Sequence, residues 1–129
     1  MATHKIKYSI EGSGISRTKE IENTQAGVAL IDGEAVATAS TDYEIGMALD
    51  VSACKSFYLE SDQNVTFETN DGTTPGNTIA LLANKPYVWH VNAYDSFLLT
   101  VDVTSVFITN ASGATATIYC VALFDATPA

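Results

Sequence analysis

The two histidines are the side chains of this sequence that could act as bases near neutral pH, and they lie far apart in the chain, at His4 and His90. No serine sits in a G-x-S-x-G elbow, and the triplet Gly12-Ser13-Gly14 is followed by neither a P-loop lysine nor a predicted helix. His90 lies in an alternating segment, typical of an ordinary strand residue, and His4 is expected in a flexible terminus. We therefore predict no catalytic residues and no enzymatic activity.

The two cysteines, Cys54 and Cys120, lack the C-x-x-C spacing and the neighbouring histidines of zinc and thioredoxin-like sites. Cys120 lies in an alternating apolar run, where a free thiol packs as a small hydrophobic side chain. Whether the two cysteines pair stays open. Oxygen-bearing loop residues lack EF-hand or nonapeptide spacing and are interpreted as solvated: Asp62, Asn70, Asp71 and Asn77. No metal site and no cofactor are predicted.

One pair of aromatic residues offers an alternative to a purely structural protein. Tyr87 and Trp89 alternate on the same predicted strand face as Val91. An exposed Tyr87 or Trp89 would suit a small carbohydrate-binding module, because aromatic rings stack on the apolar faces of sugars. Large aromatic side chains on such a face are more often part of a core, and this is the interpretation adopted here.

Charge is distributed unevenly along the chain. The net charge of -9 repels phosphate backbones, so no nucleic-acid partner is predicted. Residues 1–19 nevertheless carry four basic residues against Glu11 alone, or +3, whereas residues 20–129 carry two lysines against fourteen acids, or -12. This segment is either an edge strand whose charges discourage pairing with other chains, or a basic arm that docks on an acidic partner. On the second interpretation the contact residues are Lys5, Lys7, Arg17 and Lys19.

The length and composition predict one folded domain over residues 1–129. A chain of 129 residues with 47% hydrophobic and 16% charged residues has enough apolar surface for one core and is too apolar for disorder. No apolar stretch has the length of a signal peptide or of a membrane-spanning helix. Synthesis in the cytoplasm and no membrane partner are therefore expected.

Period-2 alternation dominates the sequence, and no window keeps helical spacing with caps at both ends. The pattern predicts about ten short strands, with tight hairpins at Asp32-Gly33 and across residues 61–64, and residues 70–77 as the longest loop. This spacing indicates an all-β sandwich or barrel, and two similar hairpins in one chain would suit the two facing sheets of a jelly roll. We therefore expect an all-β antiparallel sandwich of jelly-roll type. The segments involved are 6–10, 17–23, 28–31, 34–39, 45–51, 56–60, 65–69, 78–82, 87–92, 97–101, 105–110 and 115–124.

The chain from Asp50 onward resembles the small jelly-roll-like head decoration, or cement, proteins of tailed bacteriophages. The resemblance lies in the order and character of successive segments rather than in a fixed motif. It covers some 80 residues, and the first 49 carry little of it. The segments are KSFYLES at 55–61, NVTFETN at 64–70 with its Thr/Pro/Gly loop, TIAL at 78–81, KPYVW at 85–89, VFITNASG at 106–113 and the closing alternating strand.

The resemblance implies a non-enzymatic virion protein that sits on the outer surface of a capsid, commonly as a homotrimer at local threefold positions. Its partners would then be the major capsid protein and further copies of itself. A phage tail, baseplate or fibre module that binds a host surface is the alternative within virions, and a small carbohydrate-binding module is the alternative outside them.

Overall fold

The computed structural model describes residues 1–126 and contains strands joined by loops and a single 3-10 turn, η1 (Val51–Ala53). The all-β prediction is therefore confirmed. The ten strands are β1 (Ala2–Gly12), β2 (Ile15–Gln25), β3 (Gly27–Val36), β4 (Ser40–Leu49), β5 (Cys54–Ser61), β6 (Val65–Thr69), β7 (Thr78–Leu81), β8 (Tyr87–His90), β9 (Val103–Asn110) and β10 (Ala116–Phe124).

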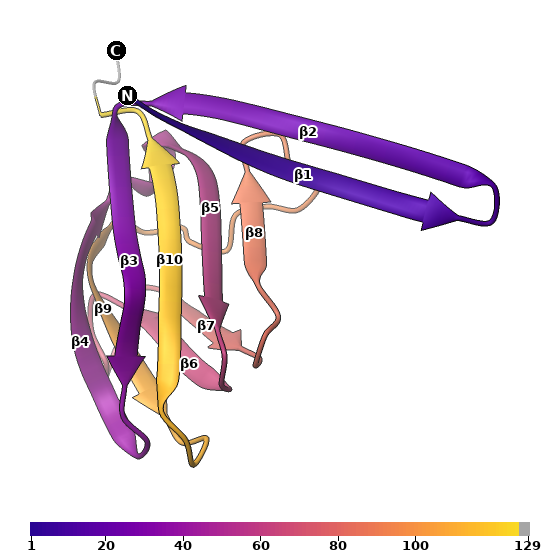
Figure 1. Ribbon diagram of the computed structural model, residues 1–129. Coiled ribbons are helices and arrows are strands. Elements are labelled where there is room, and N and C mark those ends of the chain that lie inside the picture. Colours follow the sequence, from indigo (N-terminus) through magenta and orange to yellow (C-terminus); the bar gives the residue numbers. More distant parts are fainter. Residues whose placement is uncertain (127–129) are drawn as a thin grey trace.

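Eight of these strands form two four-stranded antiparallel sheets that face each other (Figure 1). The first sheet has the order β3-β10-β5-β8 and the second the order β4-β9-β6-β7. Along the chain β3, β4, β5 and β6 alternate between the two sheets, and β7, β8, β9 and β10 alternate again. This is the arrangement of a jelly roll, so the predicted sandwich is confirmed.

The core lies between the sheets because each inner strand buries every second residue. In β5, for example, Phe57 and Leu59 are buried whereas Tyr58 and Glu60 are half-buried on the opposite face. The largest fully buried side chains of this core come from both sheets and from one loop: Phe57, Phe67, Leu49, Leu59, Leu99, Ile108 and Ile118.

The hairpin predicted at Asp32-Gly33 is wrong. Strand β3 continues through this dipeptide and pairs with β10 on both sides of it. The pairing shifts there, because Asp32 is opposite Tyr119 and Glu34 is opposite Ile118, which leaves Gly33 as an extra residue. Gly33 has a φ of 71°, so its positive φ serves a β-bulge rather than a turn.

The hairpin predicted over residues 56–69 is also wrong. Strands β5 and β6 belong to different sheets, and the link between them crosses the edge of the sandwich. The Ser61 side chain fixes this corner, donating a hydrogen bond to the Gln63 carbonyl at 2.8 Å. Alternation alone does not distinguish two strands that pair at their edges from two that pack face to face, since both have one buried face.

The segment 97–101, predicted as a strand, belongs to a twelve-residue loop over 91–102 that is longer than the predicted loop at 70–77. Side chains hold this loop against the sandwich. The Phe97 ring stacks on Trp89 at a centroid distance of 4.2 Å, and the backbone N–H of Leu98 donates to the Tyr87 hydroxyl at 3.0 Å. Its apolar residues therefore pack on the core without strand pairing.

Candidate functional site

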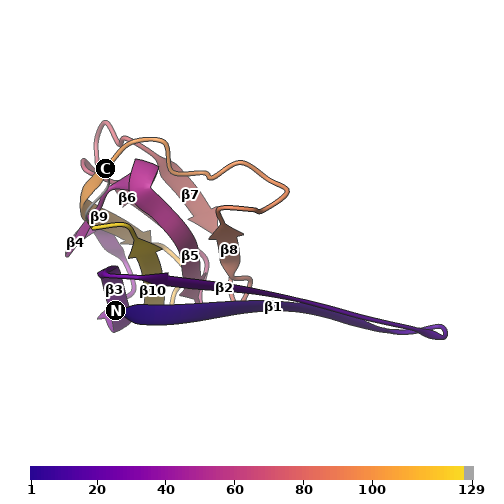
Figure 2. The same cartoon turned by 90° about the horizontal axis from the view of Figure 1, so that it is seen from above.

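Strands β1 and β2 form a separate two-stranded hairpin, called the arm below, that projects from one end of the sandwich beyond β8 (Figures 1 and 2). Its strands pair along their whole length from Ala2 opposite Gln25 to Gly12 opposite Ile15. The two residues of the turn, Ser13 and Gly14, have φ values of 50° and 79°, as a type I′ turn requires. Eleven residues per strand give the arm a length of about 36 Å. The structure thus has an arm that is longer than the 1–19 segment singled out from charge.

The arm has two chemically different faces, because residues opposite each other in an antiparallel pair lie on the same face. One face is polar and nearly balanced in charge; it holds Thr3, Lys5, Lys7, Ser9, Glu11, Ser16, Thr18, Glu20, Glu22 and Thr24. The other, called the apolar face of the arm, holds Ala2, His4, Ile6, Tyr8, Ile10, Ile15, Arg17, Lys19, Ile21, Asn23 and Gln25. All the net positive charge on this second face comes from Arg17 and Lys19.

The four basic residues predicted as contacts are therefore divided between the two faces. On the polar face, Lys5 Nζ lies 3.9 Å from Glu22 and Lys7 Nζ lies 3.8 Å from Glu20, both exposed pairs. Among residues 1–126, Arg17 and Lys19 form no ion pair, and no carboxylate shares their face of the arm. The structure does not bring the four together as one patch.

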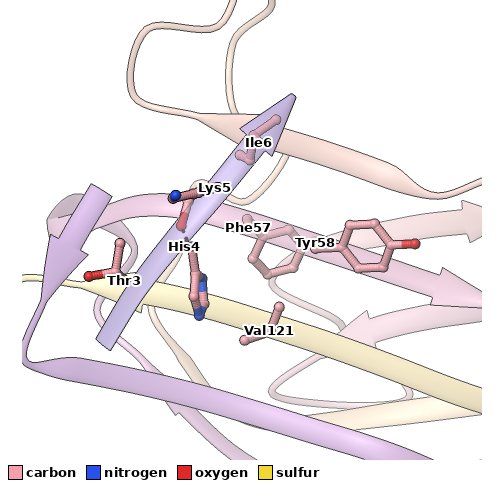
Figure 3. Close-up of a pocket in the computed structure, with 8 residues that line it drawn as sticks. Thr3, His4, Lys5, Ile6, Phe57, Tyr58 and Val121 are labelled. Atoms are coloured by element: carbon pink, nitrogen blue, oxygen red, sulfur yellow. Dashed lines mark hydrogen bonds between the residues drawn. The ribbon is translucent and has the colours of Figure 1, made fainter. Parts of the chain in front are cut away.

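The base of the arm packs its apolar face on the outer surface of the β3-β10-β5-β8 sheet. His4 Nδ1 lies 3.4 Å from the Ser56 hydroxyl, and the Tyr8 ring lies 5.9 Å from that of His90. Figure 3 shows His4 and Ile6 of β1 beside Phe57, Tyr58 and Val121, around a cavity of about 310 Å³. His4 is thus part of a packed strand rather than of a flexible terminus, which corrects the sequence prediction.

The position of the arm accounts for which outer-face residues are buried. Leu123, Ser56 and His90 form one row across β10, β5 and β8, and all three are buried although no other sheet covers that face. The arm lies across this row (Figure 2). Beyond it, the apolar face of the arm is largely uncovered by its own chain: Tyr8, which contacts His90 on one side, is 45% exposed, and Ile10 and Ile15 are 68% and 60% exposed. We call these three residues, Arg17 and Lys19 the distal arm.

The next two rows of the same outer face are only partly covered, with Tyr58, Glu60 and Val121 half-buried. One contains Leu30, Val121 and Tyr58, and the other contains Asp32, Tyr119 and Glu60. Leu30 is 57% and Tyr119 46% exposed, and these six residues, called the open patch below, surround a shallow depression of about 510 Å³. The Glu60 carboxylate accepts a hydrogen bond from the Tyr58 hydroxyl, which raises the pKa of Tyr58 to about 12. The open patch is thus apolar and acidic.

Sequence reasoning missed the open patch, although a signal for it is present. The runs 27–31 and 118–124 are apolar at nearly every position rather than at every second one. Continuous apolar strands are typical of sheets covered on both faces. These runs therefore indicate that the outer face of β3 and β10 is also suited to packing against another element.

Other candidate residues have structural roles. The Trp89 ring is covered on one side by Phe97 and donates a hydrogen bond to the Asp95 carbonyl at 3.1 Å. Tyr87 and Trp89 are both half-buried and pack against the core, as the interpretation of these aromatics as core residues predicted. His90 Nδ1 accepts a hydrogen bond from the backbone of Asn92. His90 is also opposite Ser56 in the β5–β8 pairing, and the Ser56 hydroxyl lies 3.4 Å from His4 Nδ1.

The cysteines and the polar loop residues serve the fold. Cys54 and Cys120 are free and buried, and burial raises the pKa of each thiol to about 12, which keeps it protonated. The Asp71 carboxylate accepts hydrogen bonds from the N–H groups of Thr73 and Thr74, which lower its pKa. Asn70 and Asn77 tie their loop to residues 100–104. Within residues 1–126, no three metal-ligating side chains form a group, and no helix is long and apolar enough to cross a membrane.

Comparison of this chain with models of protein families, with curated proteins and with solved structures finds no match.

The two histidines lie at the contact between the arm and the sheet, which predicts a pH dependence. Burial lowers the pKa of both His4 and His90 from 6.5, so a detached arm binds protons more readily than a packed one. Arm packing is therefore expected to weaken as the pH falls through about 6.5 toward 5. The charged groups that line a cavity together with His90 are Lys19, Glu20 and Asp95.

Hydrogen-exchange protection factors of the β1 amides measure this effect. They should fall more between pH 7 and pH 5 than those of β9, which lies in the other sheet. The double variant His4→Gln, His90→Gln is the control, and in it the protection of β1 should fall no more between pH 7 and pH 5 than that of β9. Equal pH dependence in the parent and the variant would contradict the prediction.

Proposed function

We propose that this protein is a non-enzymatic structural protein of a bacteriophage virion that decorates and stabilises the outer surface of the capsid. The resemblance from Asp50 onward supports this proposal, and a jelly-roll sandwich is compatible with it. On this proposal the protein is made in the host cytoplasm, binds the major capsid protein and acts as a homotrimer, without a nucleic-acid or membrane partner.

The single observation that carries a docking role is the distal arm. Isolated two-stranded hairpins are marginally stable in water, and apart from the contact of Tyr8 with His90 the distal arm packs on no other element of its own chain. A projecting apolar surface with two unpaired cations needs an acidic and apolar partner. In an assembly protein such an element can bind another subunit, whereas catalysis does not need it.

The proposed contacts to the capsid are the basic residues of the arm, Lys5, Lys7, Arg17 and Lys19. Charges at the edge of an interface mainly accelerate encounter and set register, so apolar contacts and avidity between linked copies must provide most of the affinity. Exposed charges contribute little to folding stability, so these residues can be changed without loss of the sandwich.

Attachment to undecorated phage heads tests the proposal. The parent should bind in hundreds of copies per particle, with density at local threefold positions. A variant with Lys5, Lys7, Arg17 and Lys19 all changed to Glu should attach more slowly, with a weaker dependence of the attachment rate on salt. A few copies per particle, confined to the tail, would favour the tail or fibre module instead. Equal attachment rates of parent and variant at every ionic strength would show that the basic residues only discourage pairing of an edge strand with other chains.

A further inference from the structure

The distal arm and the open patch have complementary chemistry. The distal arm presents three apolar side chains with Arg17 and Lys19 among them, and its face carries no acid. The open patch presents four apolar or aromatic side chains with Asp32 and Glu60 among them, and no lysine or arginine lines its depression. Each surface thus offers apolar side chains together with charges opposite in sign to those of the other surface.

The arm of one molecule cannot cover its own open patch. Its base is held across the first row of the outer face by contacts of His4, Tyr8 and Asn23 with Ser56, His90 and the Lys55 carbonyl. From there the paired strands lead the tip away past β8 (Figures 1 and 2). Bringing the tip back onto Tyr119 of the same molecule would break the hairpin ladder or detach its base.

The base of the arm already shows how this face of the sheet binds a strand. His4 and Ile6 line one cavity together with Tyr58 and Val121, two residues that also belong to the open patch. The open patch is thus the continuation, by one row, of a surface that a β1 strand already covers. A second strand of the same apolar and basic character can lie beside the first.

We propose that the distal arm of one copy lies across the open patch of a second copy. Tyr8, Ile10 and Ile15 would then cover Leu30 and Tyr119, and Arg17 and Lys19 would lie close to Asp32 and Glu60. The same contact can be made reciprocally in a twofold dimer or head to tail around a closed ring, and the threefold assembly of the proposed function requires the second arrangement. This arrangement deepens the proposed function, on which the assignment of a threefold ring to a capsid rests. It transfers Arg17 and Lys19 from the capsid contact to the contact between copies and leaves Lys5 and Lys7, on the polar face of each arm, for the capsid.

Reversal of charge on each surface tests this contact between the arm of one copy and the patch of another, called the exchange below. The test uses the isolated protein, without phage heads. Sedimentation and light scattering should show a parent oligomer. The arm variant Arg17→Glu, Lys19→Glu and the patch variant Asp32→Lys, Glu60→Lys should each weaken association by more than about tenfold, because like charges then oppose each other. Combining all four changes in one chain should restore the oligomer. The matched control Ser16→Glu, Thr18→Glu alters the same strand on the opposite face and should associate as the parent does.

Cysteine cross-linking gives a second measurement that does not depend on charge. A chain with Ile15→Cys mixed with a chain carrying Leu30→Cys should form a disulfide between the two chains. Ser16→Cys, whose side chain points to the polar face, should not cross-link to Leu30→Cys. Both native thiols are buried and protonated, so they do not compete.

Three results would overturn the exchange. They are a parent that stays monomeric up to about 1 mM, a four-change chain that does not regain association, and equal cross-linking at positions 15 and 16. If the parent is monomeric and its arm variant fails to bind heads, the distal arm contacts the capsid protein rather than a second copy. An oligomer with the predicted behaviour that never binds heads would contradict the proposed function but support the exchange.

Discussion

Replacing Phe57 with alanine is expected to lower the free energy of unfolding by about 3 to 5 kcal/mol, the usual cost of truncating a buried phenylalanine. Phe57 is 1% exposed at the centre of β5. Its ring lies 5.2 Å from Phe97 in an edge-to-face arrangement and 5.9 Å from Tyr87. The substitution therefore opens a cavity and removes one of the contacts that hold residues 91–102 on the sandwich.

Denaturant unfolding measures this effect. The midpoint should move to lower denaturant with a nearly unchanged slope. Leu98→Ala is the matched control, because Leu98 lies in the same loop but is half exposed, and it should cost no more than about 0.5 kcal/mol. A loss below about 2 kcal/mol for Phe57→Ala would mean that the aromatic cluster is not part of the cooperative core.

The class of fold could be predicted because alternation of apolar residues is a local property that the sandwich preserves. Strands β6, β9 and β10 lie close to the predicted segments, since their inner faces are mostly apolar; the outer face is mostly polar in β6 and β9 and apolar in β10. The pairing of strands could not be predicted in the same way. Whether β5 pairs with β6 or packs opposite it depends on the geometry of the corner at Ser61, which alternation does not encode.

A glycine in a dipeptide that suits a turn was also an ambiguous signal, because the sequence does not show which strand lies beside it. A positive φ at Gly14 closes the turn of the arm, whereas a positive φ at Gly33 accommodates a bulge inside a continuous strand. Both dipeptides, Ser13-Gly14 and Asp32-Gly33, suit a two-residue turn. The difference lies in the neighbouring strand, because β10 is available to pair on both sides of Gly33.

The candidate site could be predicted only in part. Clustering of basic residues near the N-terminus indicated an arm, but charge alone could not show that β2 pairs with all of β1, or that Glu20 and Glu22 neutralise the polar face. The register is what separates Arg17 and Lys19 from Lys5 and Lys7. The open patch depends on residues from three strands that are neighbours only in the folded sheet.

The second large effect is expected at Asn110, a polar residue that is completely buried at the end of β9. Its amide nitrogen donates hydrogen bonds to the carbonyls of Val36 at 2.9 Å and Ala114 at 2.8 Å. Its amide oxygen accepts from the N–H and hydroxyl of Ser112. One side chain thus ties the end of β3 to the turn between β9 and β10.

The substitution Asn110→Asp keeps the shape and removes the donor. A carboxylate would face two carbonyl oxygens without solvent, and the free energy of unfolding at pH 7 should fall by about 3 to 5 kcal/mol. The fold would raise the pKa of the new carboxyl above its unfolded value of about 3.9, so the folded state would bind the proton more tightly. The loss should therefore be largest above the raised pKa and become smaller as the pH falls toward 4.

Chemical denaturation of the parent and of Asn110→Asp at pH 7 and pH 4 measures both parts of this prediction. The matched control is Asn64→Asp, since Asn64 is exposed and its side chain only accepts a hydrogen bond, from the Ala83 N–H at 2.8 Å. A carboxylate can accept that bond equally well, so the control should stay within about 0.5 kcal/mol of the parent. If Asn110→Asp were as stable as the control at pH 7, the buried amide would not hold the turn. A loss that did not change with pH would indicate that the carboxylate escapes to solvent and that the corner of the sandwich opens around it.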